Sequence, residues 1–193
     1  MIIGITGLAG SGKDTFCRLY QEQHPTYQRI GFADKIREAL IALDPIVECD
    51  RTLSELVQRK GWDAAKRENF EVRRLLQVFG TEVGRNLFGA DVWCELACRQ
   101  IRESLHTDWI IPDVRFNNEV GALADIALRI STRFCMVRIV RQGVERLNGH
   151  ASESGIPSMH IHVEIENNGT IEDLKQMIPQ VESFVPLRER IGG

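Results

Sequence analysis

The sequence lacks the features that mark secreted, membrane and nucleic-acid-binding proteins. No stretch of its 193 residues approaches the roughly 18 consecutive apolar residues that a membrane-spanning helix needs. Its first residues, MIIGITG, contain no basic region followed by an apolar stretch, so we expect no signal peptide. The net charge is only -3 at pH 7. Bulk electrostatics therefore favour neither a nucleic acid polymer nor a membrane surface as partner.

Cysteine is scarce and scattered. The chain has five cysteines, at positions 17, 49, 94, 98 and 135. An odd number without regular spacing argues against a disulfide framework and indicates a reducing compartment, for which the cytoplasm is the simplest choice. His150, His160 and His162 lie near one another in the sequence, but no further ligand stands at a spacing typical of zinc sites.

The composition is that of an ordinary folded protein, with 43% hydrophobic and 26% charged residues. The length suits one sizeable hydrophobic core, so we expect a single domain over residues 1–193. Hydrophobic periodicity predicts strands alternating with helices. The predicted strands cover residues 1–6, 27–33, 109–114, 133–140 and 161–169, and the helices cover 14–24, 34–43, much of 52–87, 92–105, 119–130 and a segment from 170. This alternation predicts an α/β fold in three layers, with a central parallel sheet of about five strands.

The most specific motif is GLAGSGKDT, at residues 7–15. It follows an apolar strand and opens a helix, which is the context that the phosphate-binding loop G-x-x-x-x-G-K requires. Gly10, Ser11 and Gly12 would offer backbone N–H groups to anionic oxygens, and Lys13 would reach the β- and γ-phosphates. The loop therefore predicts the binding of ATP phosphates.

Asp14 stands where this pattern normally has Ser or Thr, whose hydroxyl would bind Mg²⁺. Thr15, one position later, can offer a hydroxyl to a phosphate oxygen instead. Two interpretations of Asp14 stay open: an acid that complements the helix dipole, or a group that orients Lys13 or metal-bound water. The form GKxT resembles adenylate kinases and their relatives, which points to small-molecule kinases.

Two further acids follow predicted strands, where ligands bind in open α/β sheets. Asp34 follows the apolar residues IGFA, and Asp113 follows WIIP. A carboxylate at such a position can hold hydrated Mg²⁺ or orient a substrate group, although Asp34 could also cap the helix that follows. We therefore expect Mg²⁺ to be bound through phosphates and water, with Asp34 and Asp113 as candidate contacts.

The segment RRLLQVFGTEVGR also carries a candidate binding surface. In a regular helix, Arg74, Gln77, Thr81 and Arg85 fall within an arc of about 80°, away from most of the apolar residues. Two guanidinium groups, an amide and a hydroxyl suit a phosphate and the edge of a base. The alternative is an ordinary solvated helix face.

The chain resembles the bacteriophage-type deoxynucleoside monophosphate kinases in an ordered set of segments that extends from residue 2 to about 177. The segments are GLAGSGKDT, FADKIREAL, LLQVFGTEVGR followed by DVW, DVRFNNE, HASE and NNGTIEDL. The resemblance implies the P-loop nucleoside monophosphate kinase fold, with a helical acceptor-binding insert at about 34–90 and a lid-like segment at about 141–160. It implies ATP as donor, Mg²⁺ as cofactor and a deoxynucleoside monophosphate as acceptor, and it leaves homodimer formation open.

The resemblance also assigns residues to roles. For ATP binding it implies Gly10, Ser11, Gly12, Lys13, Asp14 and Thr15, with Asn167 and Asn168 near the donor base. For acceptor binding it implies Asp34, Lys35, Arg37, Arg74, Gln77, Thr81, Arg85, Trp93, Asp113, Arg115, His150 and Glu153. For catalysis it implies Lys13, Asp34, Arg115 and Arg141, and it places Arg141, Arg146, His150 and Glu153 in the lid. Taken without the resemblance, Trp93 is equally well explained as a core residue.

The implied reaction brings two polyanions together, so Lys13, Mg²⁺ and arginines must offset their repulsion. An acceptor phosphate is already ionised near neutral pH and needs no general base, so Asp34 is assigned to positioning. A rival interpretation is a kinase with a hydroxyl acceptor, such as dephospho-coenzyme A kinase, in which Asp34 would act as base. A second is a nucleotide-sensing protein that binds ATP without turnover.

Overall fold

The structure is a computed structural model that describes residues 1–104, 106–144 and 156–184. It divides into two compact units, Met1–Gly31 with Cys98–Gly193 and, between them in sequence, Phe32–Ala97. The helical insert expected at about 34–90 falls within the second unit. Within the described ranges, no helix is both long and apolar enough to cross a bilayer.

The first unit is built on a parallel sheet of five strands, in the order β2-β5-β1-β6-β7. The strands are β1 (Ile2–Thr6), β2 (Tyr27–Arg29), β5 (Asp108–Ile111), β6 (Phe134–Val140) and β7 (Val163–Glu166). All neighbouring pairs run parallel, with β1 between β5 and β6. The predicted α/β fold with a parallel sheet of about five strands is confirmed.

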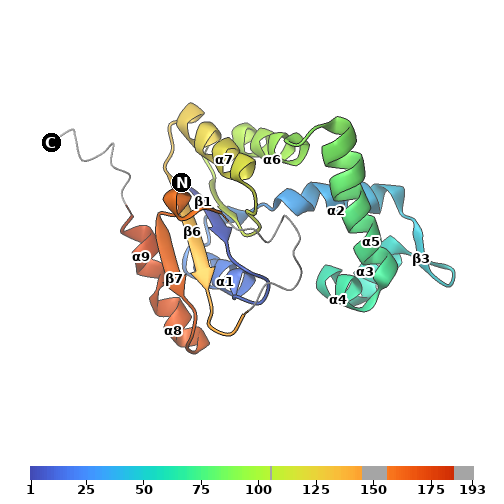
Figure 1. Cartoon of the computed structure of the whole chain (residues 1–193), viewed down its shortest axis with the longest axis horizontal. Coiled ribbons are helices and arrows are strands. Elements are labelled where there is room, and N and C mark those ends of the chain that lie inside the picture. The colour runs from blue at the N-terminus through green and yellow to red at the C-terminus, as the bar shows by residue number, and fades with distance from the viewer. Residues whose placement is uncertain (105, 145–155, 185–193) are drawn as a thin grey trace. The chain divides into compact units, whose positions relative to one another are not determined.

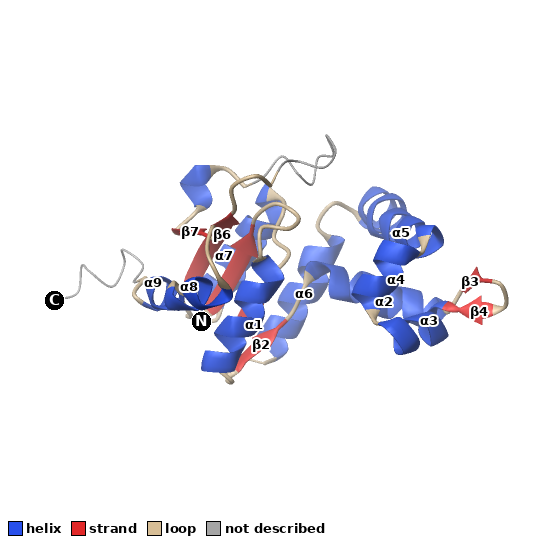
Figure 2. Cartoon of the chain, turned by 90° about the horizontal axis from the view of Figure 1, so that it is seen from below, coloured by secondary structure: helices blue, strands red, loops and turns tan. Residues whose placement is uncertain are grey.

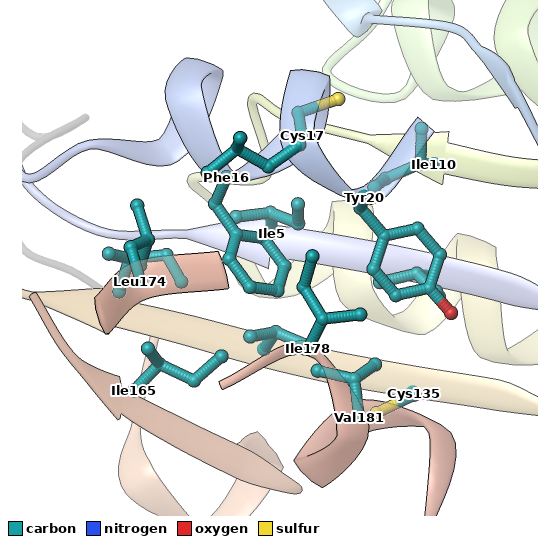
Figure 3. Packing of buried hydrophobic residues seen from close by; sticks show 14 residues of the cluster. Ile5, Phe16, Cys17, Tyr20, Ile110, Cys135, Ile165, Leu174, Ile178 and Val181 are labelled. Atoms are coloured by element: carbon teal, nitrogen blue, oxygen red, sulfur yellow. The ribbon is translucent and has the colours of Figure 1, made fainter. Parts of the chain in front are cut away.

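Helices cover both faces of this sheet (Figure 1). On one face lie α1 (Lys13–Gln23), α8 (Ile171–Gln176) and α9 (Ile178–Glu182), and on the other lies α7 (Asn117–Arg129). Figure 3 shows how Phe16 and Tyr20 of α1 pack with Ile178 of α9 over the strands. Burial on both faces explains why every residue of β1 is buried, with no polar side chain alternating outward.

The second unit is mainly helical, with one two-stranded ribbon (Figure 2). Its elements are α2 (Phe32–Leu43), β3 (Ile46–Glu48), β4 (Arg51–Thr52), α3 (Leu53–Lys60), α4 (Trp62–Glu68), α5 (Phe70–Gln77), the π-helix η1 (Val78–Phe88) and the first part of α6 (Val92–Glu103). A core of Leu40, Leu53, Leu56, Ala65 and Val72 holds these helices together. A capping box between Thr52 and Glu55 begins α3.

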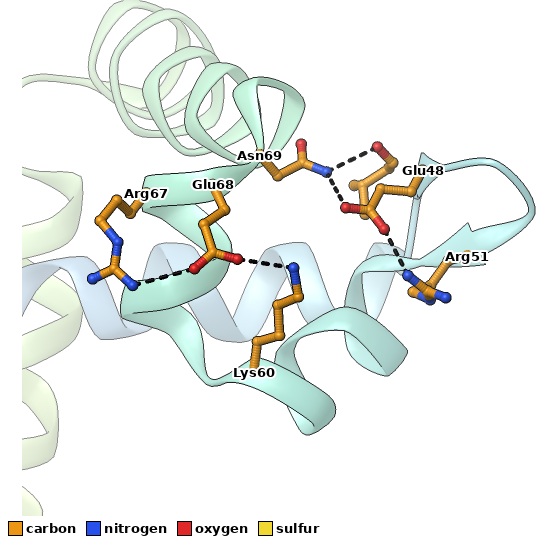
Figure 4. A network of polar contacts seen from close by, with 7 residues as sticks. Glu48, Arg51, Lys60, Arg67, Glu68 and Asn69 are labelled. Carbon is orange, nitrogen blue, oxygen red and sulfur yellow. Dashed lines mark hydrogen bonds and ion pairs between the residues drawn. The ribbon is translucent and has the colours of Figure 1, made fainter.

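Asn69 connects the ribbon of the second unit to its helices (Figure 4). Its Oδ1 accepts the backbone N–H of Val72 at 3.1 Å, which caps α5. Its Nδ2 donates to the Val47 carbonyl and to Glu48 Oε1, both at 3.2 Å. Glu48 in turn accepts from Arg51 at 2.7 Å. Asn69 therefore joins α5 to β3 directly and to β4 through Glu48.

The structure differs from the sequence predictions at several boundaries. The ribbon of β3 and β4 was not predicted, and β2 ends at Arg29 because Phe32 and Ala33 already belong to α2. The single helix expected from residue 170 is two, α8 and α9, because Pro179 lies in the first turn of α9 and lacks the N–H that would continue α8. A short 3₁₀ turn, η3 (Ser158–His160), precedes β7.

Candidate active site

The phosphate-binding motif forms a loop between β1 and α1, as predicted. Gly7, Gly10 and Gly12 have φ values of 145°, 83° and 100°, which side-chain-bearing residues rarely adopt. Gly12 is the N-cap residue of α1, and no side chain caps that end of the helix. The first amides of α1 therefore have no intrahelical acceptor, and together with the helix dipole they favour an anion.

Lys13 lies over this loop. Its Nζ donates to the carbonyl oxygens of Gly7 at 2.7 Å and Leu8 at 2.8 Å. Burial lowers the pKa of Lys13, and the nearby Arg115 lowers it further, whereas Asp14 and Asp113 act in the opposite direction. The lysine thus shares one electrostatic environment with Asp14, Asp113 and Arg115.

The remaining candidates of the first unit follow the other strands of the sheet. Asp113 and Arg115 follow β5, and Val114 between them donates its N–H to Ile5 of β1 at 3.1 Å. Arg141 is exposed directly after β6, and Asn167 and Asn168 follow β7. Since all these strands are parallel, their carboxyl ends lie at one edge, which is where ligands bind in open α/β sheets.

Asp14 and Thr15 lie in the first turn of α1, where Asp14 is exposed and Thr15 is half-buried. A carboxylate at this end of a helix complements its dipole, and it also raises the pKa of Lys13. The geometry is thus compatible with both interpretations of Asp14.

Asn167 contacts the phosphate loop directly. Its Nδ2 donates to the carbonyl oxygen of Ser11 at 2.8 Å, and its side chain is buried. Asn168 is exposed, and its Oδ1 accepts the N–H of Gln142 at 2.8 Å. The two neighbouring asparagines therefore support different segments.

Glu119, which the sequence predictions did not include, supports a candidate site residue. Its carboxylate accepts the backbone N–H groups of Arg115 and Phe116, which fixes the turn that carries Arg115. The side chain is 2% exposed, an unusual burial for a glutamate. Its position three residues after Phe116, at the start of α7, is a local signal that could have identified it.

In the second unit, the expected acceptor-binding cations form pairs within their own helices. Lys35 donates to Glu38 at 2.7 Å, and Arg37 donates to Asp34 at 3.2 Å while lying 5.6 Å from the centre of the Trp62 ring. In α5, Arg74 forms two hydrogen bonds of 2.7 Å to Glu71. This pairing raises the pKa of Arg74 and lowers the pKa of Glu71. The helix that carries Asp34, Lys35 and Arg37 packs against α5 and η1.

The predicted stripe of Arg74, Gln77, Thr81 and Arg85 rests on a regular helix, and this premise is wrong from Val78 onward. Residues Val78–Phe88 form a π-helix, whose hydrogen bonds join residue i to i+5. The side chains of Arg74, Gln77 and Thr81 are exposed and that of Arg85 is partly buried. Their alignment in one arc of about 80° therefore does not hold, since that angle assumes 100° per residue.

Trp93 is buried in the second unit, with 5% of its surface exposed. Its Nε1 donates to the Gly80 carbonyl at 2.8 Å, and its ring lies so close to Gly84 that a Cβ there would collide with it. Phe79 packs 6.4 Å away, between ring centres. Trp93 therefore packs against the π-helix η1 and stabilises it, which is the role of a core residue.

Several expected residues lie outside the part of the chain that the structure describes, namely Arg146, His150 and Glu153 of the lid-like segment. His162 follows the lid-like segment in the sequence. Its Nδ1 accepts the N–H of Met136 at 2.8 Å, and its ring stacks on Phe184. Among the described residues, no group of three or more His, Cys, Asp or Glu side chains could hold a metal ion.

The chain is similar to known proteins in sequence and in fold. Residues 48–178, more than half of the chain, match the family of deoxynucleotide monophosphate kinases. The deoxynucleotide monophosphate kinase of Escherichia phage RB69 is 26% identical over 117 residues, which are 59% of this chain and 46% of that protein. The deoxynucleoside-5'-monophosphate kinase of Escherichia phage T5 is 34% identical over 97 residues, which are 49% of this chain and 38% of that protein.

The match thus spans less than half of the length of these phage relatives. Among solved structures, TT1252 from Thermus thermophilus is similar with a TM-score of 0.51, at 19% identity, over 95% of this chain and 96% of that chain. A likeness at this identity shows the fold alone. The family match covers more than half of the chain, and the phosphate-binding loop lies between β1 and α1. This chain therefore belongs to the deoxynucleotide monophosphate kinase family.

Proposed function

We propose that this protein transfers the γ-phosphoryl group of ATP to a deoxynucleoside monophosphate and so forms a deoxynucleoside diphosphate. The observation that carries the proposal is the loop of residues 7–13, in a chain that belongs to this kinase family. Three glycines with positive φ, the N-terminus of α1 and Lys13 converge there. Such a combination suits a polyphosphate.

On the donor side, the N–H groups at the start of α1 would bind phosphate oxygens, and Lys13 would exchange its bonds to Gly7 and Leu8 for bonds to the β- and γ-phosphates. Thr15 would add a hydroxyl contact. Arg115 and Arg141 would neutralise the charge that moves with the transferred group. Asn168 would lie toward the donor base.

Mg²⁺ is expected with ATP, held through phosphate oxygens and water, with Asp113 and Asp34 as the candidate protein contacts. Asp113 follows β5 and Asp34 lies in the first turn of α2, and carboxylates of this kind suit a hydrated hard cation. When bound, the ion would neutralise phosphate charge.

On the acceptor side, we assign the monophosphate to residues of the second unit: Asp34, Lys35, Arg37, Arg74, Gln77, Thr81 and Arg85. The exposed pairs that Arg74 and Lys35 form are of the kind that contributes little to stability. Both cations can therefore exchange a carboxylate for a phosphate at small cost. Trp93 would contribute by holding η1 in place.

The acceptor is itself a phosphate, with a second pKa of about 6, so its attacking oxygen is ionised at neutral pH. A general base is then unnecessary, and in-line transfer depends on positioning and on charge neutralisation. In this mechanism Asp34 orients Arg37, to which it is bonded, rather than removing a proton. The expected setting is the cytoplasm.

A coupled assay of ADP release tests the proposal. The protein is supplied with ATP, Mg²⁺ and each deoxynucleoside monophosphate in turn, with ribonucleoside monophosphates and dephospho-coenzyme A alongside. We expect turnover with at least one deoxynucleotide and its loss in Lys13→Ala. Turnover only with dephospho-coenzyme A would favour a hydroxyl kinase, and ATP binding without turnover would favour a nucleotide-sensing protein.

A further inference from the structure

The hydrogen bond from Asn167 to the phosphate loop joins residues that are 156 positions apart in the sequence. Asn167 follows β7, and its own N–H donates to the Val140 carbonyl at 2.7 Å. Its side chain is 8% exposed. Backbone and side chain are therefore both held, and the amide that reaches Ser11 has a fixed position relative to the sheet.

Among the residues that the structure describes, the Ser11 carbonyl accepts a hydrogen bond from this amide alone. Ser11 is 1% exposed, so water cannot readily replace a lost partner of its carbonyl oxygen. A buried carbonyl without a donor is costly, and the loop would change its conformation to avoid that state. The hydroxyl of the same residue already lacks a hydrogen-bond partner among the residues that the structure describes. The loop should therefore tolerate the loss of the hydrogen bond to the Ser11 carbonyl poorly.

The orientation of the Ser11 carbonyl also determines the orientation of the next amide. In a trans peptide the C=O of Ser11 and the N–H of Gly12 point in opposite directions. By binding the carbonyl, Asn167 directs the Gly12 N–H away from itself. No backbone oxygen of the described segments accepts this N–H, so it is available to a ligand.

Gly12 is shaped by the same contact. It has a φ of 100°, and a Cβ at this position would collide with the Asn167 side-chain amide. The last glycine of the motif is therefore required twice, once by its backbone conformation and once by the approach of Asn167. This close fit ties the shape of the loop to the end of β7.

We propose that Asn167 is a positioning residue for the donor triphosphate: it sets the phosphate-binding shape of the loop and acts on the phosphates whatever base they carry. The inference rests on the proposed function, since it assumes that the loop binds ATP. It differs from the base contact that the family resemblance implies for this residue. Asn168 offers a matched control, because its side chain bonds to Gln142 and not to the loop.

The test compares ATP with inorganic tripolyphosphate, which has the phosphates and no base. Calorimetric titration measures both affinities for the wild type, Asn167→Ala, Asn167→Ser and Asn168→Ala. We expect both Asn167 variants to lose about tenfold in affinity for ATP and for tripolyphosphate alike, and Asn168→Ala to keep its affinity for tripolyphosphate. Weaker ATP binding with unchanged tripolyphosphate binding would identify a base contact and overturn the proposal.

Hydrogen–deuterium exchange of residues 7–15 without nucleotide provides a second measurement. If Asn167 holds the loop, the backbone amides of residues 7–15 exchange faster in both Asn167 variants than in the wild type. In Asn168→Ala they exchange at the wild-type rate. Equal exchange in all proteins would overturn the proposal. A wild-type protein that binds neither ATP nor tripolyphosphate would refute the proposed function, and the exchange data would still decide whether Asn167 holds the loop.

Discussion

The carboxylate of Glu119 accepts the backbone N–H of Arg115 at 2.6 Å. The same oxygen accepts the N–H of Phe116 at 3.0 Å, and the side chain is almost fully buried. The buried carboxyl group at the start of α7 thus fixes the turn after β5. Asp113 and Arg115 of this turn both act on the pKa of Lys13.

Replacing Glu119 should affect catalysis more than binding of the donor. In Glu119→Ala two backbone N–H groups lose their acceptor, and we expect a loss of about 1–3 kcal/mol of stability and a fall in kcat of up to about 100-fold. Glu119→Gln keeps an oxygen that can accept these hydrogen bonds, so it should recover part of the stability and part of kcat. Steady-state kinetics and urea denaturation measure these effects. Asp125→Ala, on the exposed side of the same helix, serves as control, and an unchanged kcat in Glu119→Ala would show that the turn does not position Arg115.

Adding one methyl group at Gly84 should destabilise the second unit. The new Cβ would collide with the indole of Trp93, and overpacking of this kind costs about 1–3 kcal/mol. Gly121→Ala is the matched control, because this helical glycine is exposed with nothing near its Cβ position, and alanine there should stabilise by about 0.5–1 kcal/mol. Equal effects of the two substitutions on urea denaturation would contradict the packing role of Trp93.

Asn69→Asp should be harmful although Asp is as good an N-cap residue as Asn. The substitution keeps the acceptor for Val72 but replaces the donor to Glu48 by a second carboxylate. We expect Asn69→Asp to lose at least as much stability as Asn69→Ala, about 1 kcal/mol or more. Adding Glu48→Gln should restore part of it. Thermal denaturation at neutral pH measures these stabilities. A melting temperature of Asn69→Asp equal to that of the wild type would show that the hydrogen bond from Asn69 to Glu48 does not stabilise the unit.

Asp44 should give the second unit a pH-dependent contribution to stability. The Ser54 backbone N–H, with the Ser54 hydroxyl in addition, holds the pKa of Asp44 below its ordinary value. A lowered folded-state pKa gives stability that is complete above the unfolded pKa of about 3.9 and is lost as pH falls through the folded value.

Asp44→Asn tests this, because Asn also tolerates the φ of 44° at this position. The wild type should melt at a higher temperature than the variant at pH 7, and the difference should shrink below about pH 4. Melting curves from pH 7 to pH 3 measure it. A difference that stays constant over this range would exclude the charge of Asp44 as its source.

Much of the fold could be predicted because its signals are local. The apolar strand, glycine loop and helix from Ile2 to Gln23 follow one another directly, and the alternation of strands and helices indicates the parallel sheet. The ribbon of β3 and β4 was missed because strands of three and two residues are too short to show a period of two.

Other parts depend on contacts between distant residues. The π-helix η1 lies where Gly80 and Gly84 meet Trp93, and a reading based on 3.6 residues per turn cannot anticipate that wider helix. No pattern in the sequence joins Ser11 to Asn167, so the support of the phosphate loop was visible only in the structure. Glu119, by contrast, lies close to the turn it holds and could have been found.

Transfer of label from ATP is the most direct test of the central claim. The protein is incubated with γ-labelled ATP, Mg²⁺ and a deoxynucleoside monophosphate, and the products are separated by anion-exchange chromatography. We predict that the label appears in the deoxynucleoside diphosphate and that Lys13→Ala forms none. Label released only as inorganic phosphate, or retained in ATP with every deoxynucleotide offered, would contradict the account.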